Sequence, residues 1–392
     1  MTSQYLLPVH NRLNITFSHG KGSYLFDKEN KSYLDFGAGI AVNSLGHCHP
    51  ALVNAIKKQS EKLWHVSNIY EIHELEQFAE KLVTNTFADY AFLCNSGAEA
   101  VECGIKMVRK YFYEKGEANR NRIITFTGAF HGRTIATISA AGKQKYIEGF
   151  EPKLEGFDNV EFGNIEAVKK AITKNTAGIL IEPIQGEEGI RASSKEFIKE
   201  LRKLADENGL LLFFDEVQCG AGRTGYLYAY EYYDVKPDII ASAKGIGGGF
   251  PIGVCLATKK AASGMKIGSH GTTYGGNPLA MAVGNSVLDV MLADGFLDNV
   301  KKNGILLKDQ LQNLVKEFPN IASEVRGIGL MLGLKIQEKY PNIDIVNKLK
   351  DQGLLVVAAG ENVLRIIPPL IISKKEIDEA ITIFKKVFAN LN

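Results

Sequence analysis

The chain has 392 residues, which at about 150 residues per domain is enough for two or three compact units. Its 46 Lys and Arg residues nearly balance its 44 Asp and Glu residues, and this net charge of +2 argues against a dedicated nucleic-acid-binding protein or a polybasic membrane anchor. Hydrophobic residues at 45% and charged residues at 23% are ordinary for a globular protein and exclude a disordered, collagenous or coiled-coil chain.

Short apolar runs bounded by Gly, Pro or charged residues predict strands that are buried on both faces. Helical patterns with apolar residues on one face lie between these runs. The alternation predicts an α/β domain with a largely parallel sheet over residues 46–300. The expected strands are Ala91–Cys94, Arg122–Phe126, Gly178–Glu182, Leu210–Asp215, Asp238–Ala241 and Ile252–Ala257, and the expected helices include Pro50–Leu63, Gly97–Lys115 and Ser194–Asn208.

The pattern changes toward the C-terminus. Two long helical stretches, 276–294 and 296–318, lead into a pair of strand-like runs broken by glycines. Shorter elements of both kinds then close the chain, so a smaller α+β domain is expected over residues 301–392. Its expected elements are the strand pair Glu324–Ile336, a helix at Ile343–Asp351, strands at Leu354–Val357 and Val363–Ile367, and a helix at Lys374–Ala389.

Two chemically useful side chains follow predicted strands. Asp215 ends an apolar strand, and ligands of open α/β sheets bind at the carboxyl ends of strands, although an acid there can also be a turn residue or a helix cap. Lys244 follows the next strand and precedes a glycine-rich run that lets a ligand approach the backbone. Such a lysine can form a Schiff base, and the alternative is a surface lysine before a glycine loop.

Two loops could bind an anion. Ser96, Gly97 and Ala98 lie between a strand and a helix, where open N–H groups of the first helical turn suit a phosphate. Ser96 and Glu99 also spell a capping box, which needs no ligand. The loop 271–278, Gly-Thr-Thr-Tyr-Gly-Gly-Asn-Pro, could complete a phosphate site or be a plain turn.

Taken in order, these four features resemble the class III, fold-type I aminotransferases, which use pyridoxal 5'-phosphate (PLP). The resemblance extends from Gly22–Asp35 through Gly46–Pro50 to Arg365. It implies an α/β fold like that of aspartate aminotransferase, with an N-terminal segment (1–45) that joins the small domain, a large PLP-binding domain (46–300) and a small α+β domain (301–392).

The resemblance also implies roles in cofactor binding. Lys244 would hold PLP as a Schiff base and would later move a proton between the substrate carbon and the cofactor. Asp215 would pair with the pyridinium nitrogen, and this cationic partner would keep the buried Asp215 ionised. The other implied contacts are Gln218 to the phenolic oxygen, Val217 and Phe130 to the two faces of the ring, and Ser96, Gly97 and Ala98 to the phosphate.

In such a family the active site is shared by a homodimer, because Thr273 would reach the phosphate of a neighbouring subunit. Thr272 is expected to contact the substrate. The sequence alone does not demonstrate the interface.

Substrate carboxylates would be bound by two arginines, since a guanidinium grips a carboxylate bidentately. By the resemblance, Arg365 binds the α-carboxylate of glutamate or 2-oxoglutarate. Arg133 binds the far carboxylate of that acid and, in the other half-reaction, the α-carboxylate of the donor. Glu187 resembles a switch residue that pairs with Arg365 when the donor is bound. Outside this pattern, Arg133 would be read as a solvated arginine and Glu187 as a loop carboxylate.

The likeness is closest to the branch of the class that acts on N2-acetylornithine. Related ornithine aminotransferases carry a tyrosine in the segment equivalent to residues 37–43, where this chain has Gly39 or Ile40 instead. An apolar wall suits an acylated nitrogen better than a free ammonium. We therefore expect transfer of the δ-amino group of N-acetylornithine to 2-oxoglutarate, giving N-acetylglutamate 5-semialdehyde and glutamate, in arginine biosynthesis. Succinyldiaminopimelate, succinylornithine, ornithine and 4-aminobutyrate remain alternative donors, and a non-catalytic binding module on the same fold is the alternative of another class.

A cytoplasmic location is expected. The five cysteines are odd in number and form no C-x-x-C pair, which favours a reducing compartment. No run approaches the roughly 18 apolar residues of a membrane helix, and residues 1–12 do not have the pattern of a leader. The run His47–Cys48–His49 does not match zinc spacings, so no metal site is expected. The balanced charge and the lack of a long apolar run likewise predict no nucleic-acid or membrane partner.

Overall fold

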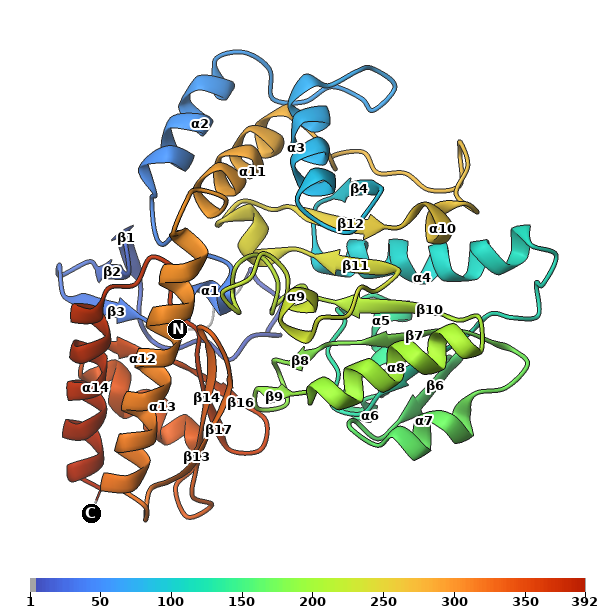
Figure 1. Cartoon of the computed structure of the whole chain (residues 1–392). Coiled ribbons are helices and arrows are strands. Elements are labelled where there is room, and N and C mark those ends of the chain that lie inside the picture. Colours follow the sequence, from blue (N-terminus) through green and yellow to red (C-terminus); the bar gives the residue numbers. More distant parts are fainter. Residues whose placement is uncertain (1–4, 392) are drawn as a thin grey trace.

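A computed structural model describes residues 5–391, so residues 1–4 of the predicted N-terminal segment lie outside the described part. Its centre is a seven-stranded sheet, in which β12 alone runs antiparallel to its two neighbours and the other pairs shared by β11, β10, β7, β5 and β6 are parallel (Figure 1). This confirms the predicted α/β fold with a mostly parallel sheet. The strands in spatial order are β4 (Tyr90–Cys94), β12 (Gly253–Ala257), β11 (Ile239–Ser242), β10 (Leu211–Asp215), β7 (Thr176–Ile181), β5 (Arg122–Phe126) and β6 (Phe157–Val160).

Helices cover both faces of this sheet because its central strands are apolar on both sides. In β10, Phe213 joins the core beneath α4 (Gly97–Glu114), while Phe214 joins the core beneath α8 (Lys195–Glu207). The prediction of burial on both faces holds only in part for the edge strand β4, where Leu93 and Cys94 are buried but Ala91 and Phe92 are half-buried. The other short elements are α5 (Ile135–Ala141), α6 (Gln144–Ile147), α7 (Ile165–Ala171), β8 (Ile184–Gln185), β9 (Arg191–Ala192), α9 (Ala229–Tyr233), the 3-10 helix η1 (Lys244–Gly247) and α10 (Lys259–Ala262).

Helices α2 (Pro50–Ser60) and α3 (His73–Thr84) pack on α11 (Pro278–Met291). Helix α12 (Phe296–Glu317) then leads into an antiparallel sheet of order β13-β14-β17-β16. No single helix within residues 5–391 is long and apolar enough to cross a membrane, and α11 and α12 meet that description only as a pair bent by 70°. The C-terminal elements are β13 (Ala322–Ile328), β14 (Met331–Ile336), α13 (Asn342–Asp351), β16 (Val357–Ala359), β17 (Val363–Ile366) and α14 (Lys374–Ala389).

The N-terminal strands lie beside the C-terminal helices (Figure 1). β1 (Phe17–Lys21), β2 (Tyr24–Asp27) and β3 (Ser32–Asp35) form a sheet that β15 (Leu354–Leu355) completes. The single strand predicted at 354–357 is therefore wrong, because β15 pairs with β3 whereas β16 pairs with β17. The short helix α1 (Ala38–Ala41) follows β3. The domain boundaries at residues 45 and 300 stay predictions.

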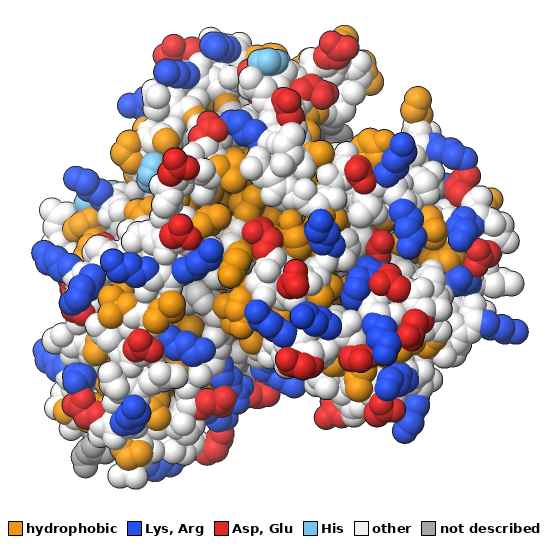
Figure 2. Space-filling view, in the orientation of Figure 1, with side chains coloured by type: hydrophobic (Ala, Val, Ile, Leu, Met, Phe, Trp, Pro, Cys, Tyr) orange, Lys and Arg blue, Asp and Glu red, His pale blue; other side chains and the backbone are white. Residues whose placement is uncertain are grey.

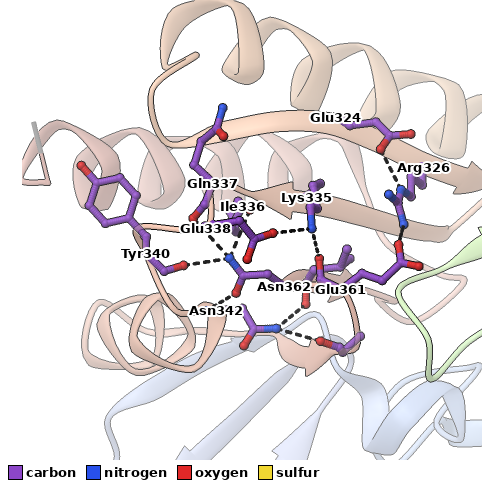
Figure 3. A network of polar contacts seen from close by, with 12 residues as sticks. Glu324, Arg326, Lys335, Ile336, Gln337, Glu338, Tyr340, Asn342, Glu361 and Asn362 are labelled. Carbon is purple, nitrogen blue, oxygen red and sulfur yellow. Dashed lines mark hydrogen bonds and ion pairs between the residues drawn. The ribbon is translucent and has the colours of Figure 1, made fainter.

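A polar network fixes the turn that leads into β17 (Figure 3). The side-chain amide of Asn362 donates to three backbone carbonyls within residues 336–340, at 3.0–3.2 Å. The neighbouring Glu361 forms an ion pair with Arg326. Asn362 adopts a positive φ of 55°, a conformation that Asn tolerates better than most residues, so these bonds stabilise a backbone shape that is otherwise unfavourable.

Charges of both signs are interspersed on the face shown in Figure 2, and hydrophobic side chains gather near its centre. This mixture matches the near-zero net charge of the sequence.

Candidate active site

One cavity of about 350 Å³ lies at the edge of the large sheet where its parallel strands end. Most of its walls come from the ends of β4, β5, β7, β10 and β11 and the segments after them, because the carboxyl ends of parallel strands meet at one edge of a sheet; Val42 and residues 249–252 complete them. Eight residues that the sequence assigned to cofactor binding line it together: Ser96, Gly97, Ala98, Phe130, Asp215, Val217, Gln218 and Lys244.

Asp215 is a buried carboxylate held by two hydrogen bonds. Its Oδ1 accepts a hydrogen bond from the backbone N–H of Val217 at 3.0 Å, and its Oδ2 accepts one from Nδ1 of His131 at 2.7 Å. Both side chains are almost completely shielded from solvent, with 3% of Asp215 and none of the His131 side chain exposed. A buried acid needs such partners, so His131 orients Asp215 toward the cavity.

Lys244 begins the short helix η1 in a left-handed conformation, with φ of 48°. Burial lowers the pKa of its amine, and the nearby charge of Arg365 lowers it further, whereas Glu187, Asp215 and Glu182 act in the opposite direction. A lowered pKa leaves more of the amine neutral, which is the form that reacts with a carbonyl group.

The N-terminus of α4 lines the cavity with Ser96, Gly97 and Ala98. Ser96 caps the helix by accepting the N–H of Glu99 at 3.3 Å, but the Glu99 carboxylate accepts the N–H of Asn95 at 2.6 Å and does not return to Ser96. A Cβ added to Gly97 would lie 2.7 Å from a methyl group of Val217, so a larger residue there would have to displace Val217. The first turn of this long helix therefore presents its N–H groups to the cavity, as a phosphate requires.

Arg365 lies beside the cavity on β17 and is 2% exposed. Its Nη1 donates to Oε1 of Glu187 at 2.6 Å and approaches Oε1 of Gln218 at 3.5 Å. Within residues 5–391 its Nε has no hydrogen-bond partner. The structure thus brings together the two members of the predicted switch in their paired state.

Arg133 is exposed and forms no ion pair within the described chain. Its guanidinium lies over two aromatic rings, 4.0 Å from the ring centre of Tyr146 and 5.5 Å from that of Phe130. Stacking positions the cation without neutralising it. Arg133 is therefore available to an anion at the side of the cavity that Phe130 lines.

Thr272 and Thr273 do not line this cavity in the chain that carries them. Oγ1 of Thr272 accepts the N–H of Gly275 at 3.1 Å, and Thr273 is exposed. Their predicted contacts with substrate and phosphate stay predictions.

Sequence reasoning assigned no role to His131 and missed Glu182. Glu182 follows β7, accepts the N–H of Phe130 at 2.9 Å and has a raised pKa, caused first by burial and then by the charge of Asp215. Its position after an apolar strand was the same signal that singled out Asp215. Nothing in the local sequence distinguishes His131 from a packed core histidine.

Comparisons with known proteins agree with this geometry. The chain matches the aminotransferase class-III family over residues 7–388. It is 57% identical to an acetylornithine aminotransferase of Brucella melitensis over 96% of this chain and 93% of the relative, and 56% identical to that of Agrobacterium fabrum over 98% and 96%. A crystal structure of N-acetylornithine aminotransferase from Stenotrophomonas maltophilia has a TM-score of 0.85 at 37% identity, covering 97% of both chains. An ornithine aminotransferase of Toxoplasma gondii with partial occupancy of PLP at its active site has a TM-score of 0.94 at 32% identity, over 99% of this chain and 92% of that one.

Proposed function

We propose that this chain, which belongs to the class-III aminotransferases, transfers the δ-amino group of N-acetylornithine to 2-oxoglutarate, a step of arginine biosynthesis. The products are N-acetylglutamate 5-semialdehyde and glutamate. One observation carries the chemistry: Lys244, Asp215 and the N-terminus of α4 line the same cavity. The relatives named acetylornithine aminotransferase, at up to 57% identity over nearly the whole chain, support the choice of donor.

Members of the class depend on PLP, and the residues present fit it. The cavity offers an amine for the aldehyde, a buried acid for the ring nitrogen and a helix N-terminus for the phosphate, in a cradle that a side chain at position 97 would fill. When bound, PLP supplies an aldehyde and a ring that withdraws electrons from the reacting carbon. Asp215 would keep a proton on the ring nitrogen, and Lys244 would move a proton between the carbon that carries the δ-amino group and the cofactor. The other contacts that would hold the cofactor come from Phe130, Val217, Gln218, Ser96, Gly97 and Ala98.

The number of carboxylates on each substrate explains why the site needs two arginines. While the Glu187–Arg365 pair is closed, Arg133 remains free for the single carboxylate of N-acetylornithine. Glutamate carries two carboxylates, so it also needs Arg365, and Glu187 must then release that guanidinium. Residues 37–43 contain no tyrosine, and Val42 of this segment lies in the cavity wall. The apolar Val42 side chain offers no partner to a free ammonium group, which supports an acylated donor.

We further propose a homodimer in which Thr273 of the second copy completes the phosphate site. Exposed apolar side chains on residues 63–70 and the loop 266–277 support it, and Asn68 joins these segments by donating to the carbonyl of Gly275 at 3.0 Å. Exposed apolar side chains gathered on adjoining segments are typical of an interface. A cytoplasmic location belongs to the same proposal, supported by five cysteines that are all free thiols. The exposed apolar side chains are Leu63, Trp64, Ile69, Tyr70, Ile267 and Tyr274.

The test is a competition assay that gives kcat/KM for N-acetylornithine, succinylornithine, succinyldiaminopimelate, ornithine and 4-aminobutyrate with 2-oxoglutarate as acceptor. We expect N-acetylornithine to lead and Lys244→Ala to abolish turnover. Arg133→Ala should damage both half-reactions, because both place a carboxylate there. Turnover by the Lys244 variant would contradict the reaction, and a leading ornithine would contradict the donor.

A further inference from the structure

A second ion pair lies next to the Glu187–Arg365 pair. Lys143, which precedes α6, forms an ion pair with Glu188, the neighbour of Glu187 in the chain. The two pairs differ in exposure: the side chains of Lys143 and Glu188 are 33% and 25% exposed, whereas that of Arg365 is 2% exposed. The difference lies in the cations, because the Glu187 side chain is 28% exposed; Lys143 is open to solvent and Arg365 is not.

The backbone between these pairs is fixed. The N–H of Gly360 donates to the carbonyl of Glu187 at 2.9 Å, and a Cβ at Gly360 would lie 3.1 Å from Cα of Glu188. Gly360 belongs to the turn that the network around Asn362 holds in place (Figure 3). When Glu187 releases Arg365, the change must therefore occur in its side chain, which is 28% exposed.

A released Glu187 needs a new counter-charge. The carboxylate would otherwise remain in a partly buried position beside Glu188, and two like charges close together repel each other. Both acids act on Lys143: burial acts to lower the pKa of its amine, but the hydrogen bond to Glu188 and the charges of Glu188, Tyr146 and, last, Glu187 raise it. Lys143 is thus a cation that pairs with the residue next to Glu187 and lies within electrostatic range of Glu187 itself.

We propose that Lys143 is a positioning residue for the switch, the second partner of Glu187 when a dicarboxylic substrate occupies Arg365. Glu188 competes with Glu187 for the same ammonium and so opposes the release. The inference rests on the proposed function, because it presumes that Arg365 binds a carboxylate of glutamate or 2-oxoglutarate.

The proposal predicts opposite effects for two variants. Lys143→Met removes the second partner, so kcat/KM for glutamate should fall about two- to five-fold, the range set by a partly exposed ion pair, while kcat/KM for N-acetylornithine changes less. Glu188→Gln frees Lys143 for Glu187, so kcat/KM for glutamate should rise relative to that for N-acetylornithine. Lys145→Met is the matched control, because Lys145 is exposed in the same segment and forms no ion pair within residues 5–391.

The experiment measures each half-reaction of the holoenzyme alone by stopped-flow absorbance, with glutamate or N-acetylornithine as the only substrate. Equal changes in both half-reactions, or a ratio that moves in the same direction in both variants, would overturn the inference. Thermal unfolding of each holoenzyme checks that the variants are folded.

Arg365→Met separates this failure from a failure of the proposed function. If that variant loses glutamate turnover while the Lys143 and Glu188 variants leave the ratio unchanged, only the role of Lys143 is wrong. If Arg365→Met reacts with glutamate as the unmodified enzyme does, the proposed substrate site itself is wrong.

Discussion

His131→Phe tests whether the hydrogen bond to Asp215 serves the cofactor. The substitution keeps an aromatic ring of similar size in a fully buried position and removes the 2.7 Å bond, so that Asp215 retains only the N–H of Val217. A hydrogen bond to a charged group contributes about 1.5–3 kcal/mol, and each 1.4 kcal/mol is tenfold in an equilibrium constant. We therefore expect PLP to bind about 10- to 150-fold more weakly if the whole loss falls on the bound state.

The assay is a visible-absorbance titration of the dialysed apoenzyme with PLP. Tyr228→Phe is a control, because it removes a buried hydroxyl that bonds Ser242 at 3.2 Å outside the cavity wall. It should lower stability with little effect on PLP affinity. Unchanged PLP affinity in His131→Phe, together with lower thermal stability, would refute the reasoning and reduce His131 to a core residue.

Three further changes test other parts of the structure. Burial raises the pKa of Glu216 to about 8, so between pH 4.5 and pH 8 the native state keeps a proton that the unfolded chain releases. The contribution of Glu216 to the free energy of unfolding is therefore complete below pH 4.5 and falls by up to about 1.4 kcal/mol per pH unit from there to pH 8. Urea unfolding should show that Glu216→Gln loses this slope, and parallel pH curves for the two proteins would contradict it. Gly104→Ala places a Cβ 2.3 Å from the ring of Phe213 and should lower the free energy of unfolding by about 1–3 kcal/mol, whereas unchanged urea unfolding would mean that the ring yields freely. Gly97→Ala pushes on Val217 and should weaken PLP binding in the absorbance titration; full affinity would argue against a phosphate on this helix N-terminus.

The sequence predicted those parts of the site that follow from position along the chain. Asp215 and Lys244 come after apolar strands, and a parallel sheet gathers such positions at one edge. Their meeting in one cavity therefore needed only the correct strands and the correct sheet type. Ser96 through Ala98 were accessible to the same reasoning, because they join a strand to a helix.

Contacts between distant segments were not predictable in this way. His131 reaches Asp215 across 84 positions of the chain, and Lys143 reaches Glu188 across 45. Neither residue stands at a strand end, and a histidine or a lysine in a loop carries no local signal of its partner. The prediction of a single strand at 354–357 failed for the same reason. β15 and β16 belong to different sheets, and a short apolar run does not encode its pairing partner.

The geometry of the Arg365 pair explains why it can both exist and open. A charge that is 2% exposed requires a counter-ion, and Glu187 supplies one through Nη1 alone, while within the described chain Nε stays without a partner. A bidentate pair would leave nothing for a substrate to gain. A substrate carboxylate that engages Nε and Nη2, which share one edge of the guanidinium, makes two charge-assisted hydrogen bonds against the one that Glu187 accepts; the gain of about 1.5–3 kcal/mol offsets the cost of moving Glu187 aside. The incomplete pair therefore favours exchange with a carboxylate while keeping the arginine neutralised when a donor without a second carboxylate is bound.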